Sequence, residues 1–248
     1  LGACSTCHTR HLFGVAVARE LAACGNCHMG PDHPQKEIYE ESKHGVAFLA
    51  NREAMNLDAI PWVLGEDYAA APTCATCHMS ALPELATNHD VGLRIAWTLR
   101  LAVSVHLEDW EVRREEMTQV CRQCHAPGFC DSSFQQYDDA VDLHNGKHAV
   151  PATEIMQRLR DAKKLTELDF DEPIEGTYFY LWHHEGRRAR HGAAMMRPDR
   201  VRWHGFHEVA DRFYNDFVPE AEEPLPGVTE PLLDGELHQW RVSAAQEP

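Results

Sequence analysis

The chain has 248 residues, of which 44% are hydrophobic, and a formal net charge of −16 with its histidines neutral. This length fits one large domain or two small ones with an ordinary core. The acidic balance disfavours nucleic acid as a partner, because phosphate binding requires clustered Lys and Arg, and a basic redox partner or a small substrate fits better. No run of 18 apolar residues occurs, so the sequence predicts no membrane span.

Four copies of the pattern Cys-x-x-Cys-His run along the chain. The cysteine pairs are Cys4/Cys7, Cys24/Cys27, Cys74/Cys77 and Cys121/Cys124, and the histidines that follow them are His8, His28, His78 and His125. This pattern is typical of haem c attachment, because two thiols at this separation reach the two vinyl groups of one porphyrin while the histidine binds the iron axially. The sequence therefore predicts four covalently attached haem c groups.

Zinc is the competing interpretation of the first two cysteine pairs. Cys4/Cys7 and Cys24/Cys27 have 16 residues between them, a spacing that a Cys₄ zinc site allows. Such a site has no use for a histidine after each second cysteine, so haem is favoured. Paired disulfides fit less well, since CxxC loops are redox-active rather than structural.

The predicted elements give a mainly α fold with a loop-rich, haem-packed N-terminal part and long C-terminal helices. Residues 1–80 hold three motifs among short Gly- and Pro-punctuated segments, and we expect the porphyrins to form much of the core there. Residues 86–125 are predicted to be helical and to deliver the fourth motif, because apolar residues recur at spacings of three and four. These apolar residues are Val91, Ile95, Leu99, Ala102 and Val103.

Further helices are predicted over 132–143 and 151–165, and a long helix over 175–217 with an interruption near Pro198. The acidic, proline-rich sequence from Val218 onward predicts an extended or disordered tail, and strand signals are weak throughout. The predicted organisation is a haem-binding region at 1–130, a helical region at 131–217 that supplies distal ligands and oligomer contacts, and a tail at 218–248.

Thirteen histidines lie outside the four motifs. Low-spin electron-transfer haems bind a second imidazole, so three or four of these histidines are expected to be distal iron ligands. A single histidine is more often a surface or core residue, but four irons favour ligation for the set. The candidates are His11, His44, His89, His184, His191 and His204.

Several stretches are longer than generic haem-attachment sequence. They are CSTCHTRH, CGNCHMGPDHPQ, ESKHGVAF, CATCHMS with TNHDVGLRIAW, CRQCHAPGF and LWHHEGRRARHGAAM. These stretches resemble the hydroxylamine oxidoreductase family of octahaem cytochromes c, and the resemblance extends to about residue 217. It matches the C-terminal, four-haem half of that family. Pentahaem ammonia-forming nitrite reductases share the same haem arrangement.

The resemblance implies a mostly helical multihaem oxidoreductase that is periplasmic or otherwise extracytoplasmic and forms homotrimers. Members move electrons between hydroxylamine, hydrazine or nitrite and a chain of closely packed haems. The implied partners are a small nitrogen compound and a redox protein, either a cytochrome or a quinone-linked protein. We expect an export signal, and further haems of a full-length parent, to precede Leu1.

The resemblance also assigns Asp32 and His33, in the GPDH segment, to the open face of the family's catalytic haem. A carboxylate beside an imidazole is suited to accept the three protons that leave when hydroxylamine is oxidised to nitric oxide. The same pair could donate protons to nitrite in the opposite direction. The alternative is that Asp32 caps a turn while His33 binds iron or faces solvent.

Two departures from the family pattern keep alternatives open. The family's catalytic haem is attached just upstream of the matching segment, which places it before Leu1; the alternative is that Cys4, Cys7 and His8 carry it. Oxidising members cross-link that haem to a tyrosine, and the corresponding position here is Arg200, with Tyr214 the nearest tyrosine. Lack of the cross-link favours a reductase of nitrite or nitric oxide.

Two hypotheses of different classes therefore stand. The chain belongs either to a multihaem oxidoreductase that uses Asp32 and His33 for proton transfer, or to an electron-transfer module in which every iron is saturated. The ninth cysteine, Cys130, is assigned no role.

Overall fold

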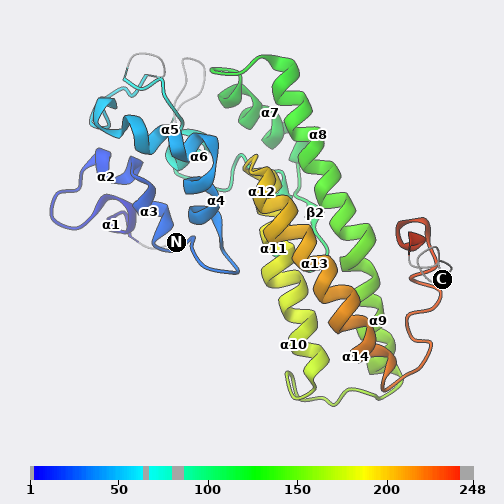
Figure 1. The fold of residues 1–248 in the computed structure, drawn as a ribbon. Helices are drawn as coiled ribbons and strands as arrows, with labels where there is room; N and C mark the ends of the chain where they lie inside the picture. Colours follow the sequence, from blue (N-terminus) through cyan, green and yellow to red (C-terminus); the bar gives the residue numbers. More distant parts are fainter. Residues whose placement is uncertain (1–2, 64–66, 80–86, 241–248) are drawn as a thin grey trace. The chain divides into compact units, whose positions relative to one another are not determined.

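The computed structural model describes residues 3–63, 67–79 and 87–240, and Figure 1 shows its ribbon. The chain divides into two compact units. Unit 1 comprises Leu1–Thr98, Val105–Gln135 and Met195–Arg197, and unit 2 comprises Leu99–Ser104, Gln136–Ala194 and Pro198–Pro248. The described residues are mostly helical, with two strands of two residues each. The predicted mainly α fold is therefore confirmed.

Unit 1 is built from short helices. They are α1 (Ser5–His8), α2 (Val15–Arg19), α3 (Leu21–Gly25), α4 (Gln35–Glu41), α5 (Lys43–Asn51), the 3₁₀ turn η1 (Arg52–Ala54), α6 (Cys74–Met79) and α7 (Trp110–Cys121). Helices of this length are marginal in water on their own, so packing must stabilise them. They share a small apolar core, which consists of Leu21, Tyr39, Phe48, Met55, Leu57, Trp62, Tyr68 and Ala71.

The turn between α4 and α5 depends on Ser42 and Gly45. The Ser42 hydroxyl caps α5 by accepting the Gly45 N–H at 3.1 Å, and it donates to the Tyr39 carbonyl at 2.7 Å. A Cβ at position 45 would overlap the Tyr39 carbonyl. The close approach of α5 to α4 therefore requires glycine here, and it fixes the direction of the neighbouring His44.

Residues 87–109 do not form the helix predicted for 86–125. Strand β1 (Trp97–Thr98) pairs antiparallel with β2 (Val105–His106), and helix begins only at Trp110, with α7. The Asn88 and Asp90 side chains accept the N–H groups of Asp90 and Gly92, which folds this segment into turns. Apolar residues three and four apart therefore occur here in turns and short strands rather than on one face of a helix.

Three continuous helical rods follow in the described residues 127–240. The first joins α8 (Pro127–His144), the π-helical η2 (Asn145–Ala149) and α9 (Val150–Asp161). The second joins α10 (Pro173–Tyr180), the π-helical η3 (Leu181–Glu185) and α11 (Gly186–Ala194). The third joins α12 (Pro198–Val201), α13 (Glu208–Asp211) and α14 (Val218–Glu222) through the π-helical η4 (Arg202–His207) and η5 (Arg212–Phe217).

These rods agree with the helices predicted over 132–143, 151–165 and 175–217. The interruption near Pro198 is confirmed, because Met196 takes a positive φ of 54° and Pro198 opens the next helix. The end of α9 is earlier than predicted. Lys163 has a φ of 57°, and its N–H and that of Lys164 bond back to Arg160 and Leu159, which closes the helix.

The core of unit 2 lies between the rods, which run side by side in Figure 1. On α9, Ala152, Ile155, Met156 and Leu159 are fully or almost fully buried and recur at helical spacing. They pack with residues of the third rod, which include Val209, Phe213 and Phe217. Burial of each large apolar side chain contributes roughly 1.5–3 kcal/mol, so this core is a main source of the stability of unit 2.

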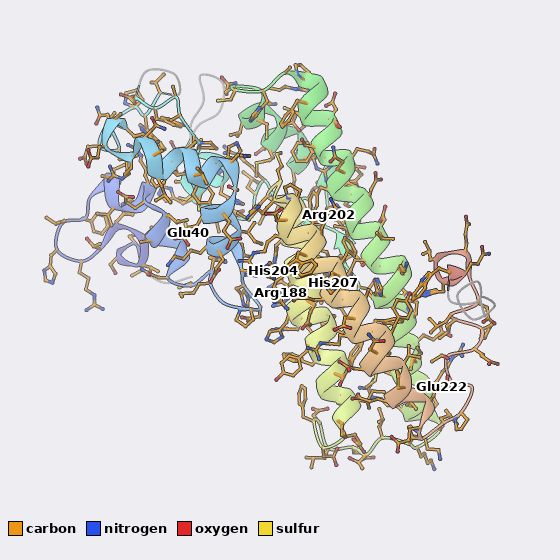
Figure 2. All side chains as sticks on the ribbon, viewed as in Figure 1. Glu40, Arg188, Arg202, His204, His207 and Glu222 are labelled. Carbon is orange, nitrogen blue, oxygen red and sulfur yellow. The ribbon has the colours of Figure 1, made fainter. Side chains whose placement is uncertain are left out.

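The predicted extended tail from Val218 is wrong for the described residues 218–240. Pro219 occupies the first turn of α14, where its missing N–H costs nothing, and Val218, Ala221, Val228 and Leu233 are buried in the unit 2 core. The Glu222 carboxylate, labelled in Figure 2, accepts the N–H groups of Gly227 and Thr229. A 3₁₀ turn, η6 (Glu236–His238), follows.

A buried arginine fastens residues 99–104 to the second rod. The Arg190 guanidinium donates to the carbonyls of Leu101, Trp182 and Gly186 at 2.8–3.0 Å and to the Ser104 hydroxyl at 2.5 Å. Its side chain is fully buried. Burial, together with the like charge of Arg187, lowers the pKa of Arg190 to about 9, which leaves it charged at pH 7.

None of the helices in the described residues combines the length and hydropathy needed to cross a bilayer.

Candidate haem sites

Each Cys-x-x-Cys-His motif forms a helical turn in unit 1. The histidine N–H of the first, second and fourth motifs bonds to the carbonyl of the first cysteine at 3.0 Å, as in His8 to Cys4. The third motif lies within α6. Residues three and four apart share one face of a helical turn, so both thiols and the imidazole point to the same side. None of the eight motif cysteines forms a disulfide, so all are available for haem attachment.

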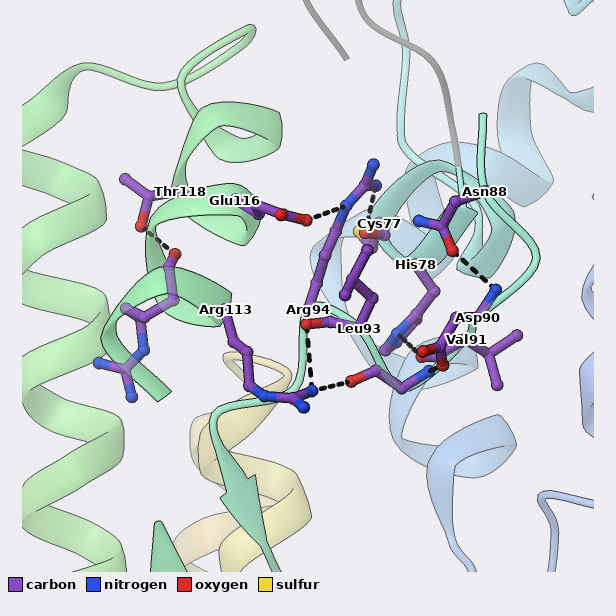
Figure 3. A network of polar contacts seen from close by, with 12 residues as sticks. Cys77, His78, Asn88, Asp90, Val91, Leu93, Arg94, Arg113, Glu116 and Thr118 are labelled. Atoms are coloured by element: carbon purple, nitrogen blue, oxygen red, sulfur yellow. Dashed lines mark hydrogen bonds and ion pairs between the residues drawn. The ribbon is translucent and has the colours of Figure 1, made fainter. Parts of the chain in front are cut away.

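Two of the motif histidines are oriented by a backbone carbonyl. The Nδ1 of His8 lies 3.3 Å from the Gly14 carbonyl, and the Nδ1 of His78 lies 3.1 Å from that of Val91, as Figure 3 shows. A donor bond from Nδ1 fixes the tautomer and leaves Nε2 as the ligand atom. These contacts are typical of metal-binding histidines.

Three motif histidines face a second imidazole. The ring centroids lie 6.4 Å apart for His8 and His89, 6.5 Å for His28 and His33, and 5.9 Å for His44 and His125. An iron held between two imidazoles through metal–nitrogen bonds of about 2 Å places the ring centroids roughly 6 Å apart. The three pairs therefore have the spacing of two axial ligands on one iron.

The thiols of consecutive motifs lie near one another. Burial and the neighbouring charges of Cys24 and Cys27 raise the pKa of the Cys7 thiol. Burial and the charge of Cys77 likewise raise the pKa of the Cys121 thiol. A hydrogen bond from Cys74 lowers the pKa of Cys24 to about 7 and correspondingly raises that of Cys74. Porphyrins attached at these thiols would form a chain in the order of the motifs.

The third motif has a buried cation beside it. The Arg94 side chain donates to the Cys77 carbonyl at 3.0 Å and lies 3.9 Å from the Glu116 carboxylate, as Figure 3 shows. Only 3% of Arg94 is exposed. Charge and hydrogen bonding close to a haem tune its reduction potential. A buried positive charge stabilises the reduced form, so Arg94 would raise the reduction potential of a haem attached at Cys77.

Asp32 and His33 form a hydrogen-bonded pair directly after the second motif. The His33 Nδ1 lies 2.6 Å from Asp32 Oδ2, and both side chains are partly exposed. Gly30, with a positive φ of 99°, turns the chain between the motif and the pair, and its N–H donates to Glu37. The carboxylate holds the Nδ1 proton, which leaves Nε2 of His33 to bind iron or to exchange a proton.

The sequence matches a known family over most of its length. Residues 2–173 match the family described as "seven times multi-haem cytochrome CxxCH". The chain belongs to this family. As a multihaem cytochrome it carries covalently bound haem c, and the clustered free thiols, the oriented histidines and the paired imidazoles of unit 1 fit that group.

Three proteins similar to this multihaem cytochrome are a curated relative and two solved structures. A probable nitrite reductase–hydroxylamine oxidoreductase fusion protein of Kuenenia stuttgartiensis is 31% identical over 177 residues, which cover 54% of this chain and 20% of the fusion. A hypothetical multihaem protein superposes with a TM-score of 0.76 and 22% identity, over 99% of this chain and 59% of its own. A chain of the Kuenenia stuttgartiensis reducing HAO-like protein complex superposes with a TM-score of 0.75 and 22% identity. The match covers 90% of the present chain and 59% of the chain in the complex.

This cytochrome therefore spans a fifth of its curated relative and 59% of each solved chain. The two structural likenesses show the fold.

The predicted distal ligands fall into two groups. His44 and His89 lie in unit 1 and face motif histidines, whereas His11 is exposed between α1 and α2. The other three, His184, His191 and His204, lie in unit 2. His204 bonds through Nδ1 to Glu208, which also pairs with Arg188 in the region labelled in Figure 2. Iron ligation by all six histidines stays a prediction.

Sequence reasoning passed over two buried histidines. His144 and His148 are 0% and 2% exposed. Burial lowers the pKa of both, that of His148 to about 3, so both are neutral at pH 7. Their spacing of four residues on one helical rod, facing the apolar core, is the signal that could have identified them as interior residues.

Proposed function

We propose that this chain is the electron-conducting, four-haem part of a multihaem oxidoreductase that acts on hydroxylamine, hydrazine or nitrite. The observation that carries the proposal is the Asp32–His33 pair at 2.6 Å, placed directly after a haem motif and open to solvent. The relatives named for nitrite reductase and hydroxylamine oxidoreductase support the same substrate class.

Bound haem supplies the iron coordination and the one-electron steps. The protein supplies proton transfer. Oxidation of hydroxylamine to nitric oxide releases three electrons and three protons, and Nε2 of His33 is the atom that takes a proton while Asp32 stabilises the resulting imidazolium. For a reductase the same atom delivers protons, and Arg200 at the position of the family's cross-linking tyrosine favours that direction. Tyr214 is a poor substitute, since its hydroxyl bonds to His238 Nδ1 at 2.8 Å.

A second candidate function follows if His33 binds iron instead of transferring protons. The 6.5 Å spacing of His28 and His33 also suits two ligands of one iron, and in that case His33 performs no proton transfer. The chain would then be an electron-transfer module. If the chain belongs to an oxidoreductase, we also propose that it forms a homotrimer in the periplasm or another extracytoplasmic compartment. Its redox partner would be a cytochrome or a quinone-linked protein.

The visible spectrum of the reduced, haem-loaded chain with and without carbon monoxide tests where the open iron lies. Carbon monoxide binds only iron with a free or weakly held axial position. Since His8 and His89 pair at the first motif, we expect haem c bands and no carbon monoxide binding at the first haem. His78 of the third motif has no such pair among the described residues, so any shift is expected from the third haem. A shift that amounts to more than one haem per chain would show that a paired motif is also open, and Cys4, Cys7 and His8 would then stand again as a candidate attachment site.

His44→Ala is expected to create a carbon monoxide site. Removal of this imidazole from its position 5.9 Å from His125 leaves the fourth haem with one axial ligand, so about one haem per chain should bind carbon monoxide. The matched control is His207→Ala, which removes an exposed histidine outside the candidate ligands and should leave the spectrum unchanged. An unshifted spectrum in His44→Ala would show that His44 is no ligand.

A further inference from the structure

The loop between α9 and α10, far along the sequence from the haem motifs, gathers carboxylates. The ligand oxygens of Asp171, Glu172 and Glu175 all lie within 4.8 Å of one another. Three like charges at this separation repel one another strongly. Surface carboxylates often gather without consequence, so the cluster alone does not define a site.

Buried oxygens distinguish this cluster from a solvated acidic surface. Glu175 is only 8% exposed. Among the described residues, no hydrogen-bond partner reaches its buried Oε2, and the same holds for Oε2 of Glu172. A buried carboxylate oxygen without a donor is costly, and an ion that it binds is one of the few physical explanations. Two such oxygens from adjacent turns of the chain point to a shared ligand.

The other oxygens of the cluster are already oriented by the loop. The Thr166 hydroxyl donates to Asp171 Oδ1 and Oδ2 at 2.9 Å, and the Thr166 N–H donates to Glu172 Oε1 at 2.8 Å. These bonds hold two carboxylates in place while their remaining lone pairs stay available. Preorganised oxygens of this kind lower the entropy lost when a ligand binds.

Three cationic side chains near the cluster only partly balance its three carboxylates. Arg160 lines the same cavity of about 170 Å³ as Glu175, and Lys163 and Lys164 precede the loop. A hard divalent cation would supply the missing charge.

We propose that Asp171, Glu172 and Glu175 bind a divalent cation of the Ca²⁺ type. Ca²⁺ takes six to eight oxygen ligands in flexible geometry, and carboxylates are among its commonest ligands. The exposed side of Asp171 gives water access to the remaining positions. The site would fix the two residues that precede α10 to the first turn of that helix. It is independent of the proposed oxidoreductase function.

Calcium binding to the haem-loaded chain tests the proposal. After chelator treatment, equilibrium dialysis with radioactive Ca²⁺ should show one site per chain. Glu175→Gln keeps the side-chain shape and removes a ligand charge, and it should weaken binding about tenfold or more. The control is Glu167→Gln, an exposed residue of the same loop outside the cluster, which should bind as the wild type does.

Thermal unfolding with and without Ca²⁺ distinguishes a bound cation from protons shared between the carboxylates. Ca²⁺ should raise the thermal midpoint of the wild type and of Glu167→Gln, but not that of Glu175→Gln. If Glu175→Gln fails to fold, Asp171→Asn, which alters an exposed side chain, takes its place. Equal Ca²⁺ binding by wild type and cluster variants would overturn the proposal. So would a wild type that binds no Ca²⁺ and is stabilised only by acid.

Discussion

Arg190→Met is expected to lower the free energy of unfolding of unit 2 by about 3–5 kcal/mol. Methionine fills much of the same volume but donates no hydrogen bond. The Leu101 and Trp182 carbonyls and the Ser104 hydroxyl then lose the guanidinium donor inside a buried region. Chemical denaturation followed by far-ultraviolet circular dichroism measures the loss.

The matched control is Arg202→Met, which makes the same change at an exposed position of unit 2 that Figure 2 labels. It should shift the free energy by no more than about 0.5 kcal/mol. If Arg190→Met were as stable as the control, the cost of burying an uncompensated cation would equal what its hydrogen bonds contribute. The hydrogen bonds of Arg190 would then make no net contribution to the stability of unit 2.

Asp32→Asn is expected to reduce turnover of the nitrogen substrate by about 10²–10⁴-fold in the complete haem-loaded protein. Asparagine keeps the size of the side chain but lacks the charge that holds the His33 Nδ1 proton and stabilises the imidazolium. The haem spectrum should stay unchanged, because proton transfer and iron coordination use different atoms. Steady-state kinetics across pH, with the spectrum of the same sample, check both parts.

Asp58→Asn makes the matching change at an exposed aspartate of unit 1 and should leave turnover unaffected. If the chain is an electron-transfer module, Asp32→Asn is expected to change the haem and not the turnover. There the variant would move the spectrum or potential of the second haem, since Asp32 would tune an iron ligand, and turnover would change little.

The haem-attachment residues could be read from the sequence because their chemistry needs a fixed local spacing. Cys4 and His8 lie one helical turn apart, so their relation does not depend on the rest of the fold. The distal imidazoles are different. His44 and His125 are 81 positions apart in the sequence, and packing within unit 1 brings them together.

The two errors of secondary structure have a common physical cause. Between Asn88 and Gly92, short polar side chains bond to nearby N–H groups and compete with helix formation. After Val218, composition suggested disorder, yet Val228 and Leu233 find apolar partners in a core built by distant helices. In both segments, interactions that a spacing rule ignores outweigh the average preference of the residues.

The π-helical segments have a consequence for how the length of this chain can vary. Each such segment contains one more residue than an α-helix of the same span, and η2, η3, η4 and η5 interrupt all three rods. Loss of one residue from η2, for example, converts it to α-helix while α9 keeps its face towards the core. Insertions and deletions are usually confined to surface loops, but in this bundle single-residue changes of length can be absorbed inside the helices themselves.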